Sequence, residues 1–277
     1  MKNFFYKDHA IKYLETGAGR PIIFLHNAGN DHTIWEHQIR HFQRSHKIYA
    51  LDQLGYGESD RPHVDYTLDL YANVLNAFIT GLEIHKPILI GNCLGSAMSI
   101  QYALKNPDKV QSMVLFNVLT KNTSDKGFFG PICKAVQGSR LASRCLTRLQ
   151  YSRITSWIAV KGCHFFLYGT KGEQDRNFVE HVQSLYAHPD QLRVFFNLIE
   201  NQKSFQGLDE IQKPHDFPPA CVVWGEKNRI LPLSAGREFC GTFNPERLDI
   251  IRDCGHLVMR ENYNRANESI EEFIGVS

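Results

Sequence analysis

The sequence predicts an α/β protein with a mostly parallel central sheet, helices on both faces and a helical insertion. Continuous apolar runs recur along the chain, as expected for strands that are buried on both faces. Helix-compatible stretches separate these runs, and this alternation is typical of a parallel sheet covered on both sides. One long interval contains no such run, which indicates a separate, helical part.

The expected elements follow in order along the chain. Residues 3–16 contain short alternating stretches broken by glycines, which predicts an antiparallel hairpin at a sheet edge. Buried strands are expected at 21–26, 47–52, 87–91, 110–116, 220–225 and 246–251. Helices are expected at about 33–43, 67–82, 95–105, 233–240 and 262–274.

The interval from 118 to 214 is too long for a loop in a compact domain. It reads as a helical cap over the carboxyl ends of the strands, where open α/β sheets bind ligands. The core domain is therefore expected at 1–117 and 215–277, with the cap at 118–214. The cap is rich in aromatic residues, which predicts an apolar lid: Phe128, Phe129, Tyr151, Trp157, Phe165, Phe166 and Tyr168.

Composition excludes several classes of function. The 277 residues carry 31 basic and 29 acidic side chains, so no basic footprint for nucleic acid is expected. No apolar stretch is long enough to span a membrane, and the N-terminal run is too short for a signal peptide, which predicts a cytoplasmic protein. Seven cysteines without CxxC spacing argue against a disulfide framework and a zinc site.

A nucleophile is predicted at Cys93, in the string Gly-Asn-Cys-Leu-Gly at 91–95. This string lies between a buried strand and a helix, where a sharp turn lifts the side chain out of the sheet. The helix that follows points its free N–H groups at the sulfur and favours a thiolate. The string matches the G-x-S-x-G pattern and resembles the α/β-hydrolase family, with Cys93 at the serine position.

The resemblance extends to other landmarks of that family. His256, in Asp-Cys-Gly-His at 253–256 after the last expected strand, takes the position of the catalytic histidine. The segment His-Asn-Ala-Gly at 26–29 resembles the family's His-Gly-x-Gly, which implies oxyanion-hole donors at Asn27 and at the N–H of Leu94. The loop 52–62 looks like the family's Asp-x-x-Gly-x-Gly-x-Ser loop, in which Ser59 and Asp60 are expected to bond backbone groups.

The third catalytic position departs from the family. Its carboxylate is expected in a Gly-x-x-Asp-x-x-x-Pro stretch, and here Asn228 stands at the Asp position. A thiol needs less help than an alcohol to lose its proton, so an amide is enough to orient His256, as in Cys-His-Asn proteases. The rival interpretation is that both positions have lost their function. Asn117 and Asp253 are alternative orienting residues.

These residues predict a catalytic set of Cys93, His256 and Asn228. The leading hypothesis is acyl transfer or hydrolysis on a hydrophobic thioester or ester through an S-acyl enzyme. The acyl substrate is expected to be a small molecule, free or presented on a carrier protein or coenzyme A. One alternative is an ester, lactone or carbon–carbon bond hydrolase, and another is a non-catalytic protein that binds ligands in the old pocket. No cofactor or metal is expected.

Overall fold

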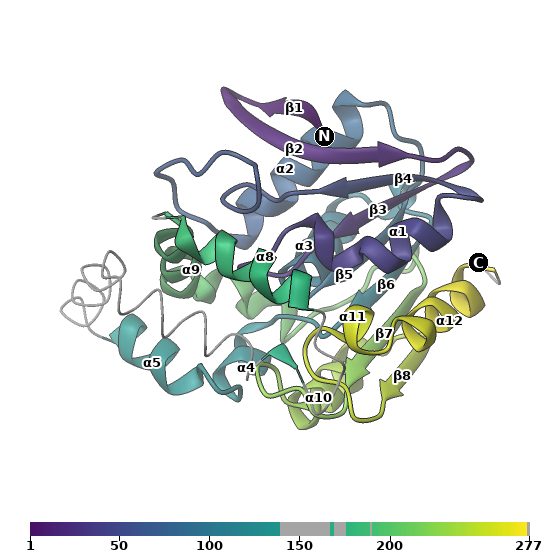
Figure 1. The fold of residues 1–277 in the computed structure, drawn as a ribbon. Helices are drawn as coiled ribbons and strands as arrows, with labels where there is room; N and C mark the ends of the chain where they lie inside the picture. The colour runs from purple at the N-terminus through teal and green to yellow at the C-terminus, as the bar shows by residue number, and fades with distance from the viewer. Residues whose placement is uncertain (139–166, 169–175, 189, 276–277) are drawn as a thin grey trace.

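An eight-stranded sheet forms the centre of the computed structural model, which describes residues 1–138, 167–168, 176–188 and 190–275 (Figure 1). The strand order is β1-β2-β4-β3-β5-β6-β7-β8. β2 is antiparallel to both β1 and β4, and the pairs from β4 to β8 are parallel. The strands are β1 (Lys2–Tyr6), β2 (His9–Thr16), β3 (Arg20–Leu25), β4 (His46–Leu51), β5 (Ile88–Asn92), β6 (Ser112–Phe116), β7 (Ala220–Gly225) and β8 (Arg247–Ile251).

Helices cover both faces of the sheet, because strand side chains alternate between two apolar cores. Ile23 and Leu25 join the core under α2, α3 and α10, whereas Ile22 and Phe24 join the core under α1, α11 and α12. These helices span α1 (Glu36–Phe42), α2 (Leu68–Gly81), α3 (Leu94–Lys105), α10 (Leu233–Phe243), α11 (Val258–Glu261) and α12 (Tyr263–Ile274), with short 3₁₀ turns η1 (His32–Trp35) and η2 (Pro107–Lys109).

The structure confirms the predicted fold class, the N-terminal hairpin and the helical insertion between β6 and β7. The predicted range 220–225 matches β7, and the other five predicted strands differ from the observed ones by one or two residues at either end. The loop after β4 also behaves as expected: Ser59 Oγ donates to the carbonyl of Asp52 and accepts the N–H of Lys12. Asp60 accepts the N–H of Ala10, so the loop is tied to the hairpin.

The insertion gathers at one end of the sheet in Figure 1, beside the carboxyl ends of the parallel strands. Its described elements are α4 (Lys121–Asp125), α5 (Gly130–Gly138), α8 (Arg176–Ala187), α9 (Gln191–Glu200) and η3 (Gln202–Leu208). The backbone carbonyl of Leu167 accepts the N–H of His256, which joins the insertion to the core. Four aromatic residues predicted for the cap lie outside the described residues: Tyr151, Trp157, Phe165 and Phe166.

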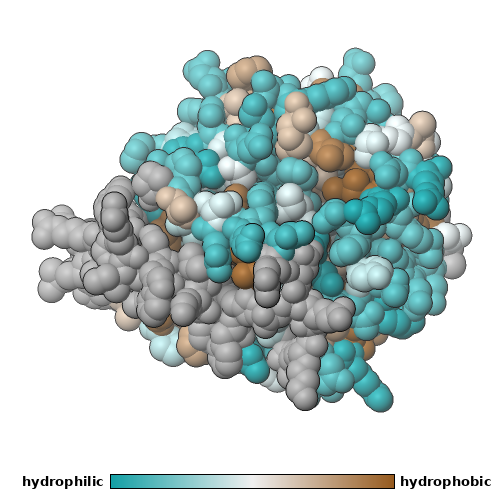
Figure 2. Space-filling model, in the orientation of Figure 1, coloured by the Kyte–Doolittle hydropathy of each residue, from teal (hydrophilic) through white to brown (hydrophobic). Residues whose placement is uncertain are grey.

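The face drawn in Figure 2 is predominantly hydrophilic, with small and separate apolar spots. Across the part of the chain that the structure describes, no helix has the length and apolar character needed to cross a membrane.

Candidate active site

Cys93 occupies a strained turn between β5 and α3. Its φ of 54° and ψ of −105° lie in a region that non-glycine residues rarely adopt. The backbone N–H of Cys93 donates to the carbonyl of Phe116 on β6, and its carbonyl accepts the N–H of Ala97 in α3. Both bonds hold the turn from either side, so the strain is maintained by the sheet and the helix together.

The two glycines that flank Cys93 are required by close backbone approach. A Cβ on Gly91 would lie 2.3 Å from the carbonyl carbon of Gly95, and a Cβ on Gly95 would lie 2.1 Å from the carbonyl oxygen of Leu25. No side chain fits at either position without moving backbone atoms. The turn therefore needs glycine on both sides of the cysteine, as the sequence pattern indicates.

Two backbone N–H groups converge on the sulfur of Cys93. One belongs to Leu94, as expected, and the other belongs to Ala28 in the loop after β3. The side-chain amide of Asn27 instead donates to the carbonyl of Ala28, 3.0 Å away. The donor from this loop is thus the backbone of Ala28, which sequence reasoning missed, while the side chain of Asn27 supports the loop. Two converging N–H groups are the arrangement of an oxyanion hole.

His256 and Asn228 lie together behind this turn, each just past the end of a parallel strand. The amide nitrogen Nδ2 of Asn228 is 3.1 Å from Nδ1 of His256, and its oxygen Oδ1 is 3.3 Å from the same ring atom. His256 is 1% exposed and Asn228 is 4% exposed. The structure therefore brings the predicted histidine and its predicted orienting residue into contact in a nearly dry environment.

Asn117 joins this group from the end of β6. Its amide oxygen accepts the Nδ2 group of Asn228 at 2.9 Å, and its own Nδ2 donates to the backbone carbonyl of His256 at 3.1 Å. Asp253, the other alternative, lies on an exposed turn, and its backbone N–H donates to the carboxylate of Glu226. Of the two alternatives, the structure places Asn117 within the buried group.

Burial dominates the protonation of the site. It raises the pKa of the Cys93 thiol to about 12, although the hydrogen bonds from Leu94 and Ala28 act in the opposite direction. It also lowers the pKa of His256 to about 3. At neutral pH the closed site therefore holds a thiol and a neutral imidazole. The thiolate that the helix was expected to favour at Cys93 is therefore disfavoured, as is an imidazolium at His256, because both charged forms would lose their hydration.

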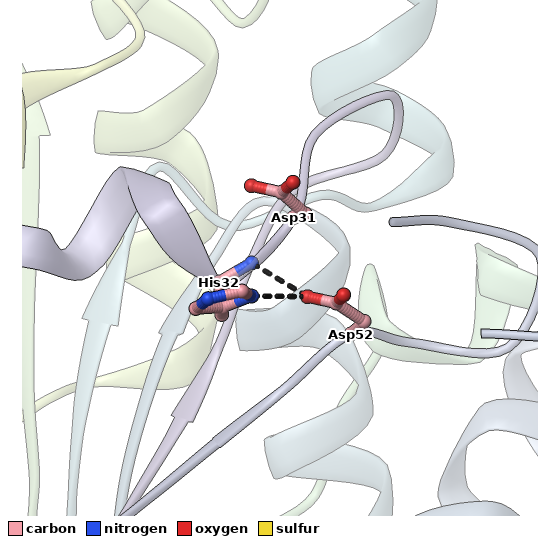
Figure 3. Close-up of side chains that lie close together, drawn as sticks. All are labelled: Asp31, His32 and Asp52. Carbon is pink, nitrogen blue, oxygen red and sulfur yellow. Dashed lines mark hydrogen bonds and ion pairs between the residues drawn. The ribbon is translucent and has the colours of Figure 1, made fainter. Parts of the chain in front are cut away.

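A second buried cluster lies beside the loop after β3 and contains Asp31, His32 and Asp52 (Figure 3). Asp52 Oδ1 accepts both the backbone N–H and the ring Nδ1 of His32, at 2.9 and 2.7 Å, and its Oδ2 accepts the N–H of Glu58. Asp31 Oδ1 accepts two bonds from Thr33. These are the ligand types that a metal ion uses, but the carboxylates already serve as acceptors for protein donors. We assign the cluster a structural role.

Helix α8 of the insertion contacts this cluster and the loop after β3. His181 Nε2 lies 2.6 Å from Asp31 Oδ2, and the hydroxyl of Tyr186 would lie 2.3 Å from a Cβ on Gly29. Gly29 has a φ of 84°, a conformation that favours glycine, and the loop passes so close to α8 here that a Cβ would meet the Tyr186 hydroxyl. The insertion thus rests on the segment that carries the N–H of Ala28.

The pair between His181 and Asp31 predicts a pH-dependent attachment of α8. The hydrogen bond to Asp31 raises the pKa of His181. Burial alone would raise the pKa of Asp31, but the bonds from His181 and Thr33 outweigh it and hold that pKa at about 2. A raised histidine pKa stabilises the fold below about pH 6.5, and this contribution is lost as pH rises through the folded-state pKa. The Asp31 contribution is lost only toward pH 2.

We expect the protein with His181→Gln to show a lower Tm at pH 6 and an unchanged Tm at pH 9. The difference at pH 6 should be about 1–3 °C, because His181 is partly exposed and water screens the pair. His32 and Asp52 also act on His181, the first lowering and the second raising its pKa, so the slope belongs to the whole cluster. His85→Gln, at an exposed site, is the control. Equal losses of Tm at both pH values would contradict the assignment.

Comparisons with known proteins agree with this architecture. A family model described as alpha/beta hydrolase fold matches residues 20–131. The 2-hydroxy-6-oxononadienedioate/2-hydroxy-6-oxononatrienedioate hydrolase of Escherichia coli (strain K12) is 25% identical over 275 residues, covering 95% of this chain and 90% of the relative.

Solved structures show the same fold. An α/β-hydrolase fold protein from Burkholderia ambifaria superposes with a TM-score of 0.83 at 19% identity, covering 98% of this chain and 97% of that one. A meta-cleavage product hydrolase from Pseudomonas fluorescens gives a TM-score of 0.76 at 18% identity, covering 99% and 97%. With the sheet order and the turn at Cys93, these matches show that the protein has the α/β-hydrolase fold.

Proposed function

We propose that the protein is a hydrolase that cleaves an ester, lactone or carbon–carbon bond next to a carbonyl group, through an S-acyl intermediate on Cys93. The observation that carries the proposal is that the backbone N–H groups of Leu94 and Ala28 both hydrogen-bond to the Cys93 sulfur. A carbonyl carbon bonded to this sulfur would place its oxygen near both donors. His256, in the loop that follows β8, is the residue proposed to exchange protons with the thiol and the leaving group.

The proposed reaction has two steps, acylation of Cys93 and hydrolysis of the acyl group. The sulfur of Cys93 bonds to the carbonyl carbon, its proton passes to Nε2 of His256, and the bond to the leaving group breaks as the leaving group takes that proton. Water then attacks the acyl group, gives its proton to His256, and the thiol is regenerated. The names of the relatives favour water as the acceptor, because the Escherichia coli relative is named a hydrolase. Thioesterase or acyltransferase chemistry rests on the reactivity of a thiol alone.

A small apolar cavity of about 70 Å³ lies at Cys93 and supports a substrate with an uncharged, apolar group beside its carbonyl. The insertion supplies much of its wall, and no lining residue among those that the structure describes carries a charge. A buried carboxylate there would lack a charged partner, which is costly. The lining includes Ala28, Leu119, Phe129, Cys133, Phe195 and Leu198. We therefore propose a neutral substrate, in contrast to the dioate for which the Escherichia coli relative is named.

The test is an intact-mass experiment on the protein and on Cys93→Ala. Each is mixed separately with p-nitrophenyl hexanoate, a hexanoyl thioester, the six-carbon lactone and p-nitrophenyl hydrogen adipate. The adipate ester carries a terminal carboxylate. We expect a hexanoyl adduct on the protein, none on Cys93→Ala, and ester hydrolysis lowered on the order of 10³-fold in that variant. The adipate ester should react at least ~10-fold more slowly.

Three other results have distinct meanings. Equal hydrolysis by Cys93→Ala would exclude the S-acyl route. A faster reaction with the adipate ester would reject the apolar substrate while leaving the hydrolase proposal intact. No adduct and no turnover, together with saturable binding of the hexanoate ester to both proteins, would reject the hydrolase and favour a binding protein that uses the same cavity.

A further inference from the structure

We infer that Asn117 is a positioning residue which, acting through Asn228, holds His256 in the tautomer protonated at Nε2. Both asparagines are buried, Asn117 at 0% and Asn228 at 4% exposed. Each lies past the end of its strand, so backbone groups of the sheet surround both amides. Those backbone groups determine which end of each amide is oxygen and which is nitrogen.

The orientation of the Asn117 amide is fixed first. The backbone N–H of Gly225 lies 3.1 Å from Oδ1, and the backbone carbonyl of His256 lies 3.1 Å from Nδ2. An N–H only donates and a carbonyl only accepts, so exchanging the two ends of the amide would break both bonds. Nδ2 also donates to the amide oxygen of Asn92 at 3.1 Å. The oxygen of Asn117 is thereby directed at Asn228.

The Asn228 amide is fixed by three further contacts. Its Oδ1 accepts the backbone N–H groups of Ile230 and Leu231, each at 3.0 Å. Its Nδ2 donates to the oxygen of Asn117 at 2.9 Å. Two donors already occupy the lone pairs of Oδ1, which leaves the second N–H of Nδ2 as the group that faces Nδ1 of His256 at 3.1 Å.

A ring nitrogen that accepts a hydrogen bond carries no proton, so the proton of the neutral ring lies on Nε2. An aspartate at position 228 would do the reverse, because a carboxylate only accepts and would draw the proton to Nδ1. In serine proteases the change from aspartate to asparagine leaves the geometry intact but gives the wrong tautomer. Here the wrong tautomer is the ground state, and a chain of amides from Gly225 through Asn117 maintains it.

This inference adds a proton-transfer step to the proposed hydrolysis. Only that added step rests on the proposed function, whereas the tautomer of His256 does not. Nε2 of the resting ring is a donor and cannot take the proton of the Cys93 thiol. Before the attack, Nε2 must lose its proton to water and Nδ1 must gain one from water, which breaks the hydrogen bond from Nδ2 of Asn228 to Nδ1. The cysteine is therefore kept as an unreactive thiol between turnovers.

The tautomer is directly measurable by ¹⁵N NMR of the histidine side chains at pH 7, with His256 assigned by its absence in His256→Gln. We expect the wild-type ring to be protonated at Nε2. Asn117→Gly is the informative variant, because the φ of 43° at this position suits glycine. We expect it to raise the Nδ1–H population at least ~5-fold, since the Asn228 amide loses one of its anchors.

Asn92→Ala is the matched control, since it removes a partner of both Asn117 and the His256 backbone carbonyl without touching the Asn228 amide. We expect it to leave the tautomer unchanged. A wild-type ring protonated at Nδ1 would overturn the inference outright, whether or not the variants fold. A folded Asn117→Gly with the wild-type tautomer would overturn the role of Asn117. Neither measurement requires a substrate, so failure of the proposed hydrolase activity would be seen separately.

Discussion

Asn228→Asp is expected to raise hydrolysis at Cys93 on the order of 10²-fold, within the range that general acid–base catalysis contributes. The carboxylate keeps the bonds from Ile230 and Leu231, since it accepts as the amide oxygen does. It also accepts Nδ1–H of His256, which frees Nε2 to take the thiol proton. A negative charge beside the ring raises the pKa of His256 from about 3 and makes it a stronger base.

The measurement is kcat/KM for p-nitrophenyl hexanoate across pH 5–9, with Tm recorded for every protein. Asn117→Asp is the matched control, because it adds the same charge one hydrogen bond farther from the ring and leaves the N–H of Asn228 in place. We expect this control to gain much less. A lower Tm is expected for Asn228→Asp, since the carboxylate faces the oxygen of Asn117 and loses that bond. A folded Asn228→Asp without a gain in rate would show that the tautomer does not limit the reaction.

The strands of the sheet were predictable because the signal for each strand lies in consecutive residues. A run such as 21–26 is apolar without interruption, and such runs form strands buried on both faces. The ends of strands are less well marked: the run at 110–116 begins with residues that precede β6, which starts at Ser112. There the limit is set by pairing with β5, in which Ile88 lies opposite Ser112, and not by the residue types.

The candidate site was predictable in its residues but not in its bonds. The glycines around Cys93 identify the turn, because only glycine fits so close to the backbone. In the loop after β3, however, the group that hydrogen-bonds to the Cys93 sulfur is a backbone N–H, and the side chain of Ala28 gives no indication of it. The orientation of the Asn228 amide depends on an N–H of β7 reached through Asn117. Such a chain arises only when strands distant in sequence come together.

The contact of the insertion with the loop was likewise not predictable. His181 and Asp31 are separated by 150 positions, and the sequence holds 13 histidines. No periodic pattern links them, since their contact follows from the way α8 packs on the loop after β3. Long-range polar pairs of this kind depend on tertiary packing, whereas turns and strands depend mainly on neighbours in sequence.

Cys93→Ser is expected to lower kcat/KM on the order of 10³-fold when residue 228 remains asparagine. A serine hydroxyl has a much higher pKa than a thiol, so its proton must be taken by a histidine that an acid supports. Here His256 is neutral, and Asn228 directs its proton to the wrong nitrogen. The smaller oxygen also lies farther from an acyl group than sulfur does, which weakens the attack further.

The double variant Cys93→Ser with Asn228→Asp tests whether the two residues depend on each other. We expect the aspartate to recover clearly more than the ~10²-fold that it gives the cysteine, because the serine then faces a ring whose Nε2 accepts its proton. The aspartate should help the serine more than it helps the cysteine, since a thiol loses its proton more easily. The four proteins form a double-mutant cycle, in which a non-additive gain measures the coupling. Strict additivity would mean that Cys93 and Asn228 act independently, and the cysteine–asparagine pair would then have no joint chemical basis.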